Sequence, residues 1–275
     1  MKGTSIAFLG AGHLGSSMIS GLIANHYEAE KIWATARHQE TLSTLKKKFK
    51  DVHTTLDNRE AVEAAEVIII AVLPSQVKEL VFSVRDIFQK KNPLVISVVA
   101  GVTIPHLNHW IGKELPIILS MPNTPAKIGA GATGLYANDQ VNAQQKALTS
   151  FLFETFGKVV WVKEPDGIHQ VLAVSASGVA YILCVMEAMK QAGCQLGLQE
   201  ESADNLVKQT VLGAAKMALE TSQSLEQLLQ SIVVPNGTTE QALKVFQEKG
   251  LFALFAEAMQ AAYNRAHEIS KTLDV

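Results

Sequence analysis

Apolar and polar positions follow two alternating patterns over the first 160 residues of the chain. Several short runs are almost continuously Val, Ile and Leu, as is typical of parallel strands covered on both faces. The predicted strands span residues 6–9, 32–35, 67–72, 94–99 and 116–120, and residues 131–137 and 159–162 extend the same sheet. Helical spacing predicts helices over residues 14–24, 39–48, 59–64, 75–88 and 141–153. This alternation predicts a doubly wound α/β domain.

The pattern changes after residue 162, where helical spacing replaces the strand-like runs. Further helices are predicted over residues 168–192, 201–221, 225–231, 239–248 and 251–273. We therefore predict a mostly parallel sheet domain over residues 1–163 and an all-helical domain over residues 164–275. The first helix of the second domain is apolar on most of its circumference and needs burial on every side. A second subunit would supply that burial, giving a homodimer or higher homo-oligomer through the C-terminal helices; packing within one chain is the alternative.

Composition adds constraints on partners and compartment. The 275 residues are 48% apolar and 18% charged, which is typical of a globular protein. A net charge of -2 gives no reason to expect nucleic acid or an anionic membrane as a partner. The N-terminal apolar run is too short for a signal peptide, so we expect a cytoplasmic protein without a membrane span. Cys184 and Cys194 lie too far apart along a predicted helix for a disulfide and are expected to be buried, reduced thiols.

The segment Gly10–Gly15 (GAGHLG) lies between the first predicted strand and the first predicted helix. This is the pattern G-x-G-x-x-G in the context that dinucleotide binding requires. The first glycine allows a tight turn, the second lets a pyrophosphate approach the backbone, and the third lets helix and strand pack closely. The helix N-terminus adds unpaired N–H groups and the positive end of its dipole. The sequence therefore predicts a Rossmann-like dinucleotide-binding domain; a glycine-rich turn without a ligand is the alternative.

The end of the second predicted strand bears on the choice of cofactor. NAD enzymes usually place Asp or Glu there to bind the ribose 2′-hydroxyl. Here Thr35 leads into Arg37, and the first carboxylate is Glu40. A guanidinium beside a threonine hydroxyl suits a 2′-phosphate, so we predict NADP, with NADPH preferred and NADH possible. The alternative is that Arg37 is a solvated residue at the start of a helix.

Seven segments together resemble the pyrroline-5-carboxylate reductase family over essentially the whole chain. They are IAFLGAGHLG from residue 6, EVIIIAVLP from residue 66, ISVVAGV from residue 96, MPNTPA from residue 121, VSASGVAY from residue 174, QTVLGAAKM from residue 209 and PNGTT from residue 235. The resemblance implies NADPH-dependent hydride transfer to a small cyclic imino acid, pyrroline-5-carboxylate. The product would be L-proline, in the final step of proline biosynthesis.

The glycine loop, the strand end and the resemblance together give a set of cofactor-binding positions. These are Gly10, Gly12, His13, Leu14, Gly15, Thr35, Arg37, Asn58, Ala71, Val72, Leu73, Pro74, Ala100, Gly101 and Asn123.

A second set of positions concerns the substrate. Pro235–Thr239 precedes a predicted helix, whose N-terminal N–H groups suit an anion. The resemblance implies that Thr239 is the catalytic residue and hydrogen-bonds the ring nitrogen. It implies further substrate-binding residues, namely Ser175, Asn236, Gly237 and Thr238, the last three cradling the carboxylate. The alternative is that Thr238 or Thr239 is only a helix N-cap.

The chain departs from the family pattern at six positions. The family usually has Lys where this chain has Leu73, Arg where it has Leu119, Gly and Pro where it has Ala176 and Val179, and Ser and Gly where it has Val234 and Asn236. These differences leave open a catalytically weakened NADPH-binding protein with a regulatory role, or another imine reductase. A β-hydroxyacid dehydrogenase is a further alternative, but residues 178–189 lack the lysine that such enzymes place on the long helix.

Three histidines are candidates for metal ligands or catalytic groups. His106 and His109 form H-x-x-H, but no carboxylate or thiol pattern accompanies them, so a surface pair is favoured and no metal site is predicted. His169 lies at the start of a helix near the domain boundary, where it is a candidate for approaching the site.

Overall fold

The computed structural model describes residues 3–273 and separates into two compact units. Unit 1 comprises Met1–Ser177 together with Ala262–Val275, and unit 2 comprises Gly178–Ala261. The predicted boundary between residues 163 and 164 lies just after the last strand of the sheet. The two compact units are instead defined by contacts within each unit, and they divide the chain at Ser177 and Ala262. The division into domains therefore stays a prediction.

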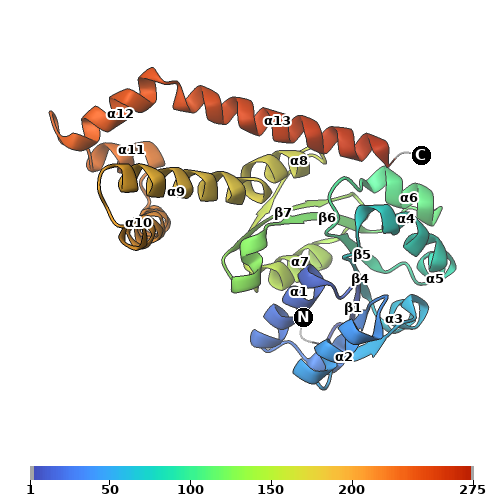
Figure 1. Ribbon diagram of the computed structural model, residues 1–275. Helices are drawn as coiled ribbons and strands as arrows, with labels where there is room; N and C mark the ends of the chain where they lie inside the picture. The colour runs from blue at the N-terminus through green and yellow to red at the C-terminus, as the bar shows by residue number, and fades with distance from the viewer. Residues whose placement is uncertain (1–2, 274–275) are drawn as a thin grey trace. The chain divides into compact units, whose positions relative to one another are not determined.

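Unit 1 is built on one eight-stranded sheet (Figure 1). Its strands are β1 (Ile6–Leu9), β2 (Ile32–Thr35), β3 (His53–Thr55), β4 (Val67–Ile70), β5 (Leu94–Ser97), β6 (Ile117–Pro122), β7 (Gly131–Ala137) and β8 (Gly157–Trp161). The spatial order is β3-β2-β1-β4-β5-β6-β7-β8, and only the β6–β7 pair is antiparallel. The order reverses beside β1, so the carboxyl ends of β1 and β4 flank the point where an open α/β sheet binds its ligand.

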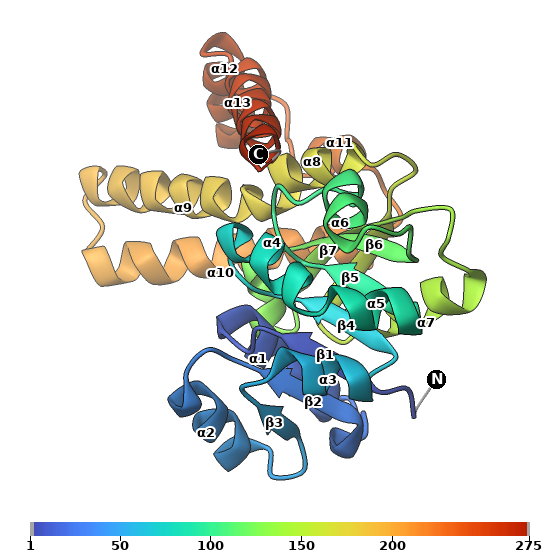
Figure 2. The same cartoon turned by 90° about the vertical axis from the view of Figure 1, so that its right-hand side faces the viewer.

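Helices cover both faces of the sheet. One core joins the sheet to α1 (His13–Ala24), α2 (Gln39–Lys48) and α7 (Ala143–Glu154). The other core joins it to α3 (Asn58–Ala64), α4 (Pro74–Ser83), α5 (Arg85–Lys91) and α6 (Ile104–Ile111). Figure 2 shows α3 and α5 in front of the strands. β1, β4 and β5 are buried along their whole length, which explains their continuous Val, Ile and Leu.

After β8, the described residues form helices joined by short loops. They form α8 (Gly167–Val171), a π-helical turn (Leu172–Ala176), α9 (Gly178–Gln195), α10 (Glu200–Glu220), α11 (Leu225–Ser231), α12 (Thr238–Glu248) and α13 (Leu251–Thr272). Within unit 2, α9 packs against α10. By length and composition alone, the continuous helix Gly167–Gln195 could cross a membrane, with a mean hydropathy of 1.9. A helix that is covered by a second subunit has the same composition.

The predicted fold class is confirmed, with three local corrections. β3 and α6 were not predicted, and the single helix expected over residues 75–88 is two helices that meet at Val84. The two cysteines are free thiols, as predicted. The expected burial is wrong for the chain as described, because Cys184 is exposed and Cys194 is half-buried.

Candidate functional site

The glycine loop connects β1 to α1 at the carboxyl edge of the sheet. Gly10 has φ +106°, and the N–H groups of Gly10 and Ala11 donate to the carbonyl of Thr35 at 3.2 and 2.6 Å. α1 begins directly after Gly12, and no side chain caps it. The first N–H groups of an α-helix lack an intrahelical acceptor. The loop therefore presents an uncapped, positive helix end to whatever lies in front of it.

The three glycines of the loop have three different surroundings. A Cβ on Gly10 would lie 2.6 Å from the carbonyl oxygen of Ala71, and one on Gly15 would lie 2.4 Å from that of Gly10. A Cβ on Gly12 would meet no described atom within 4 Å. Gly10 and Gly15 are therefore required by the packing of the protein itself. Gly12 instead faces open space in front of the helix end, as expected if a ligand must approach the backbone there.

That open space belongs to a cleft of about 800 Å³ in unit 1. Ten of the predicted cofactor positions line it: Gly10, Gly12, His13, Leu14, Thr35, Arg37, Asn58, Ala71, Val72 and Leu73. Five do not: Gly15, Pro74, Ala100, Gly101 and Asn123. The sequence-based prediction missed one wall, formed by Gln76, Glu79, Leu80 and Ser83 of α4. These residues are spaced i, i+3, i+4, i+7, which places them on one face of the helix that begins at Pro74. The sequence pattern could therefore have predicted them as cleft residues.

Two side chains at and after the end of β2 form polar contacts with other residues that line the cleft. The Thr35 hydroxyl, which is buried, donates to Asn58 Oδ1 at 2.6 Å. Thr35 therefore fixes Asn58 and has its one hydrogen already engaged. Arg37 is exposed and lies against Gln76: with the Gln76 amide oxygen turned toward it, Arg37 donates from Nη1 at 2.5 Å and from Nη2 at 3.2 Å. The guanidinium is thus held at the rim of the cleft by a neutral amide, and among residues 3–273 it forms no ion pair with a carboxylate.

Two of the residues that differ from the family pattern, Leu73 and Leu119, have different surroundings. Leu73 is 60% exposed on the wall of the cleft. Leu119 is 5% exposed, lies on β6 and belongs to the second core. A cation at position 119 would need a buried partner, whereas Leu73 leaves an apolar surface where the family usually carries a charge.

Asn123 and Ser175 bracket the end of β6. Asn123 Oδ1 accepts from the Ala132 N–H at 2.9 Å, and its Nδ2 donates to the carbonyl of Ser175 at 3.3 Å. Ser175 lies in the π-helical turn, where the Ser177 N–H bonds to the Leu172 carbonyl. The Ser175 Oγ is buried and has no hydrogen-bond partner among the described residues. π-turns inside α-helices occur frequently at functional sites, and a buried hydroxyl without a protein partner is free to bind a ligand.

Gly101 has a structural reason for being glycine. It has φ +82°, and a Cβ there would lie 2.8 Å from Cγ2 of Ile269 on α13. Gly101 therefore allows the C-terminal end of α13 to approach the loop after β5. It lines a second, smaller cavity that shares no lining residue with the first. His169 lines that second cavity too and does not reach the main cleft.

The predicted substrate loop lies in unit 2 at the start of α12. Asn236 has φ +60°, and its N–H donates to Glu240 Oε2 at 2.9 Å. The N–H of Gly237 donates to the Val234 carbonyl at 2.9 Å. Gly237, not a threonine, is the N-cap of α12, so the N-cap alternative for the two threonines is wrong. Thr238 and Thr239 instead supply the first N–H groups of α12.

The two histidines of the H-x-x-H pair have different surroundings. His106 is buried, stacks on Trp110 and accepts from the Thr103 N–H through Nδ1, whereas His109 is exposed. The expectation of a surface pair was therefore wrong for His106.

Comparisons with known proteins agree with the geometry of unit 1. Residues 5–101 match a family model described as NADP oxidoreductase, coenzyme F420-dependent, and residues 165–269 match one described as pyrroline-5-carboxylate reductase dimerisation. A pyrroline-5-carboxylate reductase of Pseudomonas aeruginosa is 38% identical over 273 residues, which is 99% of each chain. The chain belongs to the pyrroline-5-carboxylate reductase family.

Solved structures of this family have the same fold. A pyrroline-5-carboxylate reductase from Coxiella burnetii is 46% identical, with a TM-score of 0.94 over 97% of this chain and 98% of that one. The enzyme of Plasmodium falciparum, solved with NADP bound, is 26% identical, with a TM-score of 0.84 over 98% and 99% of the two chains. The six departures from the family's motifs therefore lie within a family fold that is retained throughout.

Proposed function

We propose that this chain is an NADPH-dependent pyrroline-5-carboxylate reductase that forms L-proline in the cytoplasm. The observation that carries the proposal is the open space in front of Gly12, at an uncapped helix end, in a chain that matches reductases of this family over its whole length. A backbone N–H cluster of this kind binds a pyrophosphate. The chemistry of a bound NADPH is the donation of a hydride.

The cofactor preference is argued from the rim of the cleft. Arg37 follows the end of β2 and lines the cleft, near the place where the adenosine ribose lies in a dinucleotide-binding fold. A guanidinium can form charge-assisted hydrogen bonds to a 2′-phosphate, each worth about 1.5–3 kcal/mol. Gln76 would orient Arg37 without competing for its charge. We therefore propose a preference for NADPH, with NADH as the weaker alternative.

The substrate role is assigned to the start of α12 and to Ser175. Thr238 and Thr239 offer N–H groups and hydroxyls at a helix N-terminus, which suits the substrate carboxylate and ring nitrogen. The iminium carbon of a protonated cyclic imine is a ready hydride acceptor, so the protein mainly has to position it. Thr239 would hold the ring nitrogen, while Ser175 would offer its unpartnered hydroxyl. Asn236 and Gly237 would shape the loop, because their N–H groups are already engaged.

We also propose that the active protein is a homodimer or a higher oligomer built through the C-terminal helices. α9 is 18 residues long and has no buried residue in the single chain. Ile182 and Leu183 of this helix are 48% and 58% exposed. Leaving such a surface in water is unfavourable, and burial by a second subunit explains its composition better than a membrane does.

The proposal is tested by steady-state kinetics of the purified protein with NADPH and pyrroline-5-carboxylate. We expect substrate-dependent NADPH oxidation. Thr239→Val removes one hydrogen bond to the ring nitrogen and should lower kcat/KM about tenfold, or by about 1–2 kcal/mol. Thr44→Val, at an exposed position of α2, is the matched control and should leave kcat/KM unchanged. Tight NADPH binding without oxidation would favour the regulatory alternative, and unchanged kinetics in Thr239→Val would refute its assigned role.

A further inference from the structure

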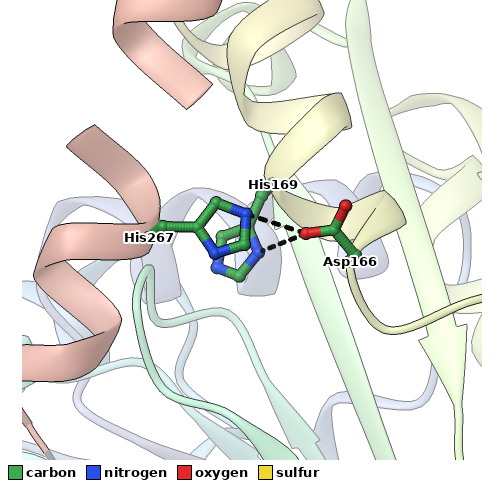
Figure 3. Close-up of side chains that lie close together, drawn as sticks. All are labelled: Asp166, His169 and His267. Atoms are coloured by element: carbon green, nitrogen blue, oxygen red, sulfur yellow. Dashed lines mark hydrogen bonds and ion pairs between the residues drawn. The ribbon is translucent and has the colours of Figure 1, made fainter. Parts of the chain in front are cut away.

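Two histidines and one aspartate meet at a second place in unit 1, away from the main cleft. Asp166 is the residue before α8, His169 lies in α8, and His267 lies near the end of α13 (Figure 3). His169 Nδ1 is 3.3 Å and His267 Nε2 is 2.9 Å from the same oxygen, Asp166 Oδ1. All three side chains are half-buried. Among residues 3–273, this is the one group of three or more such side chains that is close enough to share a metal ion.

The other polar atoms of the cluster are held by neighbours. Tyr263 donates its hydroxyl to Asp166 Oδ2 at 2.7 Å, and Gln170 Nε2 donates to the same oxygen at 3.3 Å. Oδ2 is thereby engaged, and Oδ1 is directed toward the two imidazole rings. These contacts fix the orientation of the carboxylate before any ligand arrives. Such supporting hydrogen bonds around candidate ligands are typical of metal sites.

Ser270 lies against the second ring nitrogen of His169. The Ser270 Oγ lies 3.1 Å from the Ala266 carbonyl oxygen and 3.0 Å from His169 Nε2. Two neutral tautomers of His169 fit these contacts. With the hydrogen on Nδ1, His169 donates to Asp166 Oδ1; with the hydrogen on Nε2, it donates to Ser270 Oγ and the lone pair of Nδ1 points at Asp166 Oδ1. The second tautomer is the one that can bind a metal ion through Nδ1.

In the tautomer with the hydrogen on Nε2, Nδ1 and Asp166 Oδ1 face each other at 3.3 Å as two acceptors, and a metal ion bound to both satisfies both. Burial lowers the pKa of His169 and opposes a proton on both ring nitrogens, whereas Asp166 acts in the other direction. Two imidazole nitrogens and one carboxylate oxygen suit Zn²⁺, Co²⁺ or Ni²⁺, and do not suit Mg²⁺ or Ca²⁺, which prefer oxygen ligands.

We propose that Asp166 Oδ1, His169 Nδ1 and His267 Nε2 bind one divalent transition-metal ion of the Zn²⁺ class. Tetrahedral Zn²⁺ with bonds of about 2.0–2.1 Å separates its ligand atoms by roughly 3.4 Å. The two distances to Asp166 Oδ1, 3.3 and 2.9 Å, are close to that spacing, and all three ligand atoms lie within 4.8 Å of one another. The ion would join the end of α13 to the turn before α8.

Three protein ligands leave one coordination position for water or another small ligand. The cavity beside the cluster has a volume of about 220 Å³, and the three ligands form part of its wall together with Ser97, Thr103 and Ser120. The fourth ligand of the ion would therefore come from this cavity. Since the cavity shares no lining residue with the main cleft, metal binding does not require the proposed cofactor site.

The test is a calorimetric titration of chelator-treated, full-length protein with ZnCl₂. We expect one tightly bound equivalent and a rise in melting temperature on addition of the metal. His267→Gln and Asp166→Asn should each abolish both effects. Ser270→Ala removes the hydroxyl oxygen that accepts from His169 Nε2 in the metal-binding tautomer, and it should weaken binding about ten- to a hundredfold. His109→Ala is the matched control, because His109 is an exposed histidine outside the cluster.

The exposed thiol of Cys184 is the competing ligand for zinc, so the Co²⁺ spectrum serves as a second readout. We expect ligand-field bands without a thiolate charge-transfer band, unchanged in Cys184→Ser. Melting curves in the presence of chelator establish whether each variant is folded. Identical zinc titrations in the parent, His267→Gln and Asp166→Asn would overturn the proposal, as would a thiolate band that disappears in Cys184→Ser.

Discussion

The contrast between Gly12 and Gly15 provides the most direct test of the dinucleotide site. The two glycines are three residues apart in one loop, yet a Cβ would meet open space at Gly12 and the carbonyl oxygen of Gly10, at 2.4 Å, at Gly15. Gly12 has φ -69° and ψ -159°, which alanine adopts without strain. Gly12→Ala should therefore fold as well as the parent, to within about 1 kcal/mol, since a poorer N-cap offsets a less flexible unfolded chain.

The methyl group that Gly12→Ala adds would occupy the space that the pyrophosphate needs. Losing about two charge-assisted hydrogen bonds costs about 3–6 kcal/mol, which corresponds to roughly a hundred- to ten-thousandfold in Kd for NADPH. Gly15→Ala instead overpacks the junction of β1 and α1. It should lower stability by about 1–3 kcal/mol and the melting temperature by about 2–4 °C for each kcal/mol.

Two assays separate these effects. Thermal melting without cofactor should distinguish Gly15→Ala from the parent and leave Gly12→Ala almost unchanged. Fluorescence titration with NADPH at a temperature where all variants are folded should show the large loss in Gly12→Ala. The reasoning is refuted if Gly12→Ala binds NADPH like the parent, or if it melts as early as Gly15→Ala.

Three further predictions concern single side chains. Arg37→Ala should reduce the ratio of kcat/KM for NADPH to that for NADH, and an unchanged ratio would mean that another group reads the 2′-phosphate. Tyr27 donates to the Thr4 carbonyl at 2.6 Å, and burial raises its pKa from 10.0 to about 12. The folded state keeps the phenol protonated, so up to about 3 kcal/mol of stability is lost as pH rises from 10 through 12. Tyr27→Phe should flatten that loss in alkaline melting curves, and a curve parallel to the parent's would contradict it. Hydrogen bonds from Arg59 lower the pKa of Asp86 to about 2. The stability that these hydrogen bonds add is present above pH 3.8 and is lost as pH falls through 2. The melting temperature of Asp86→Asn should therefore fall less steeply with pH in this range than that of the parent. An equally steep fall would rule out this ion pair as the cause.

The sequence was most informative where burial is complete. The bounds of β1 and β2 were predicted correctly because buried parallel strands have continuous apolar runs between turns. β3 (HTT) is short and polar, and it lies at the edge of the sheet, so no periodicity marked it. The break between α4 and α5 has no Pro or Gly. The Ser83 carbonyl at that break accepts from Arg59 Nη1 at 2.8 Å, a contact 24 residues away in sequence that a local pattern cannot reveal.

For the site, local sequence predicted the loop but not its supports. The glycine pattern gave distinct roles to Gly10, Gly12 and Gly15, and the surroundings of each fit those roles. The partners of Thr35 and Arg37, namely Asn58 and Gln76, depend on how β2, α3 and α4 meet, and no spacing within one segment encodes that. The cluster around Asp166 was missed for the same reason, because His267 is a hundred residues away and comes from another helix.

The origin of the hydrogen in the product tests the central claim most directly. The purified protein would be incubated with pyrroline-5-carboxylate and NADPH deuterated at C4 of the nicotinamide, on each face in turn, and the proline analysed by mass spectrometry. The account predicts L-proline that carries one deuterium at C5 from one of the two labelled cofactors and none from the other. Proline without label from either cofactor, or no proline at all, would contradict it.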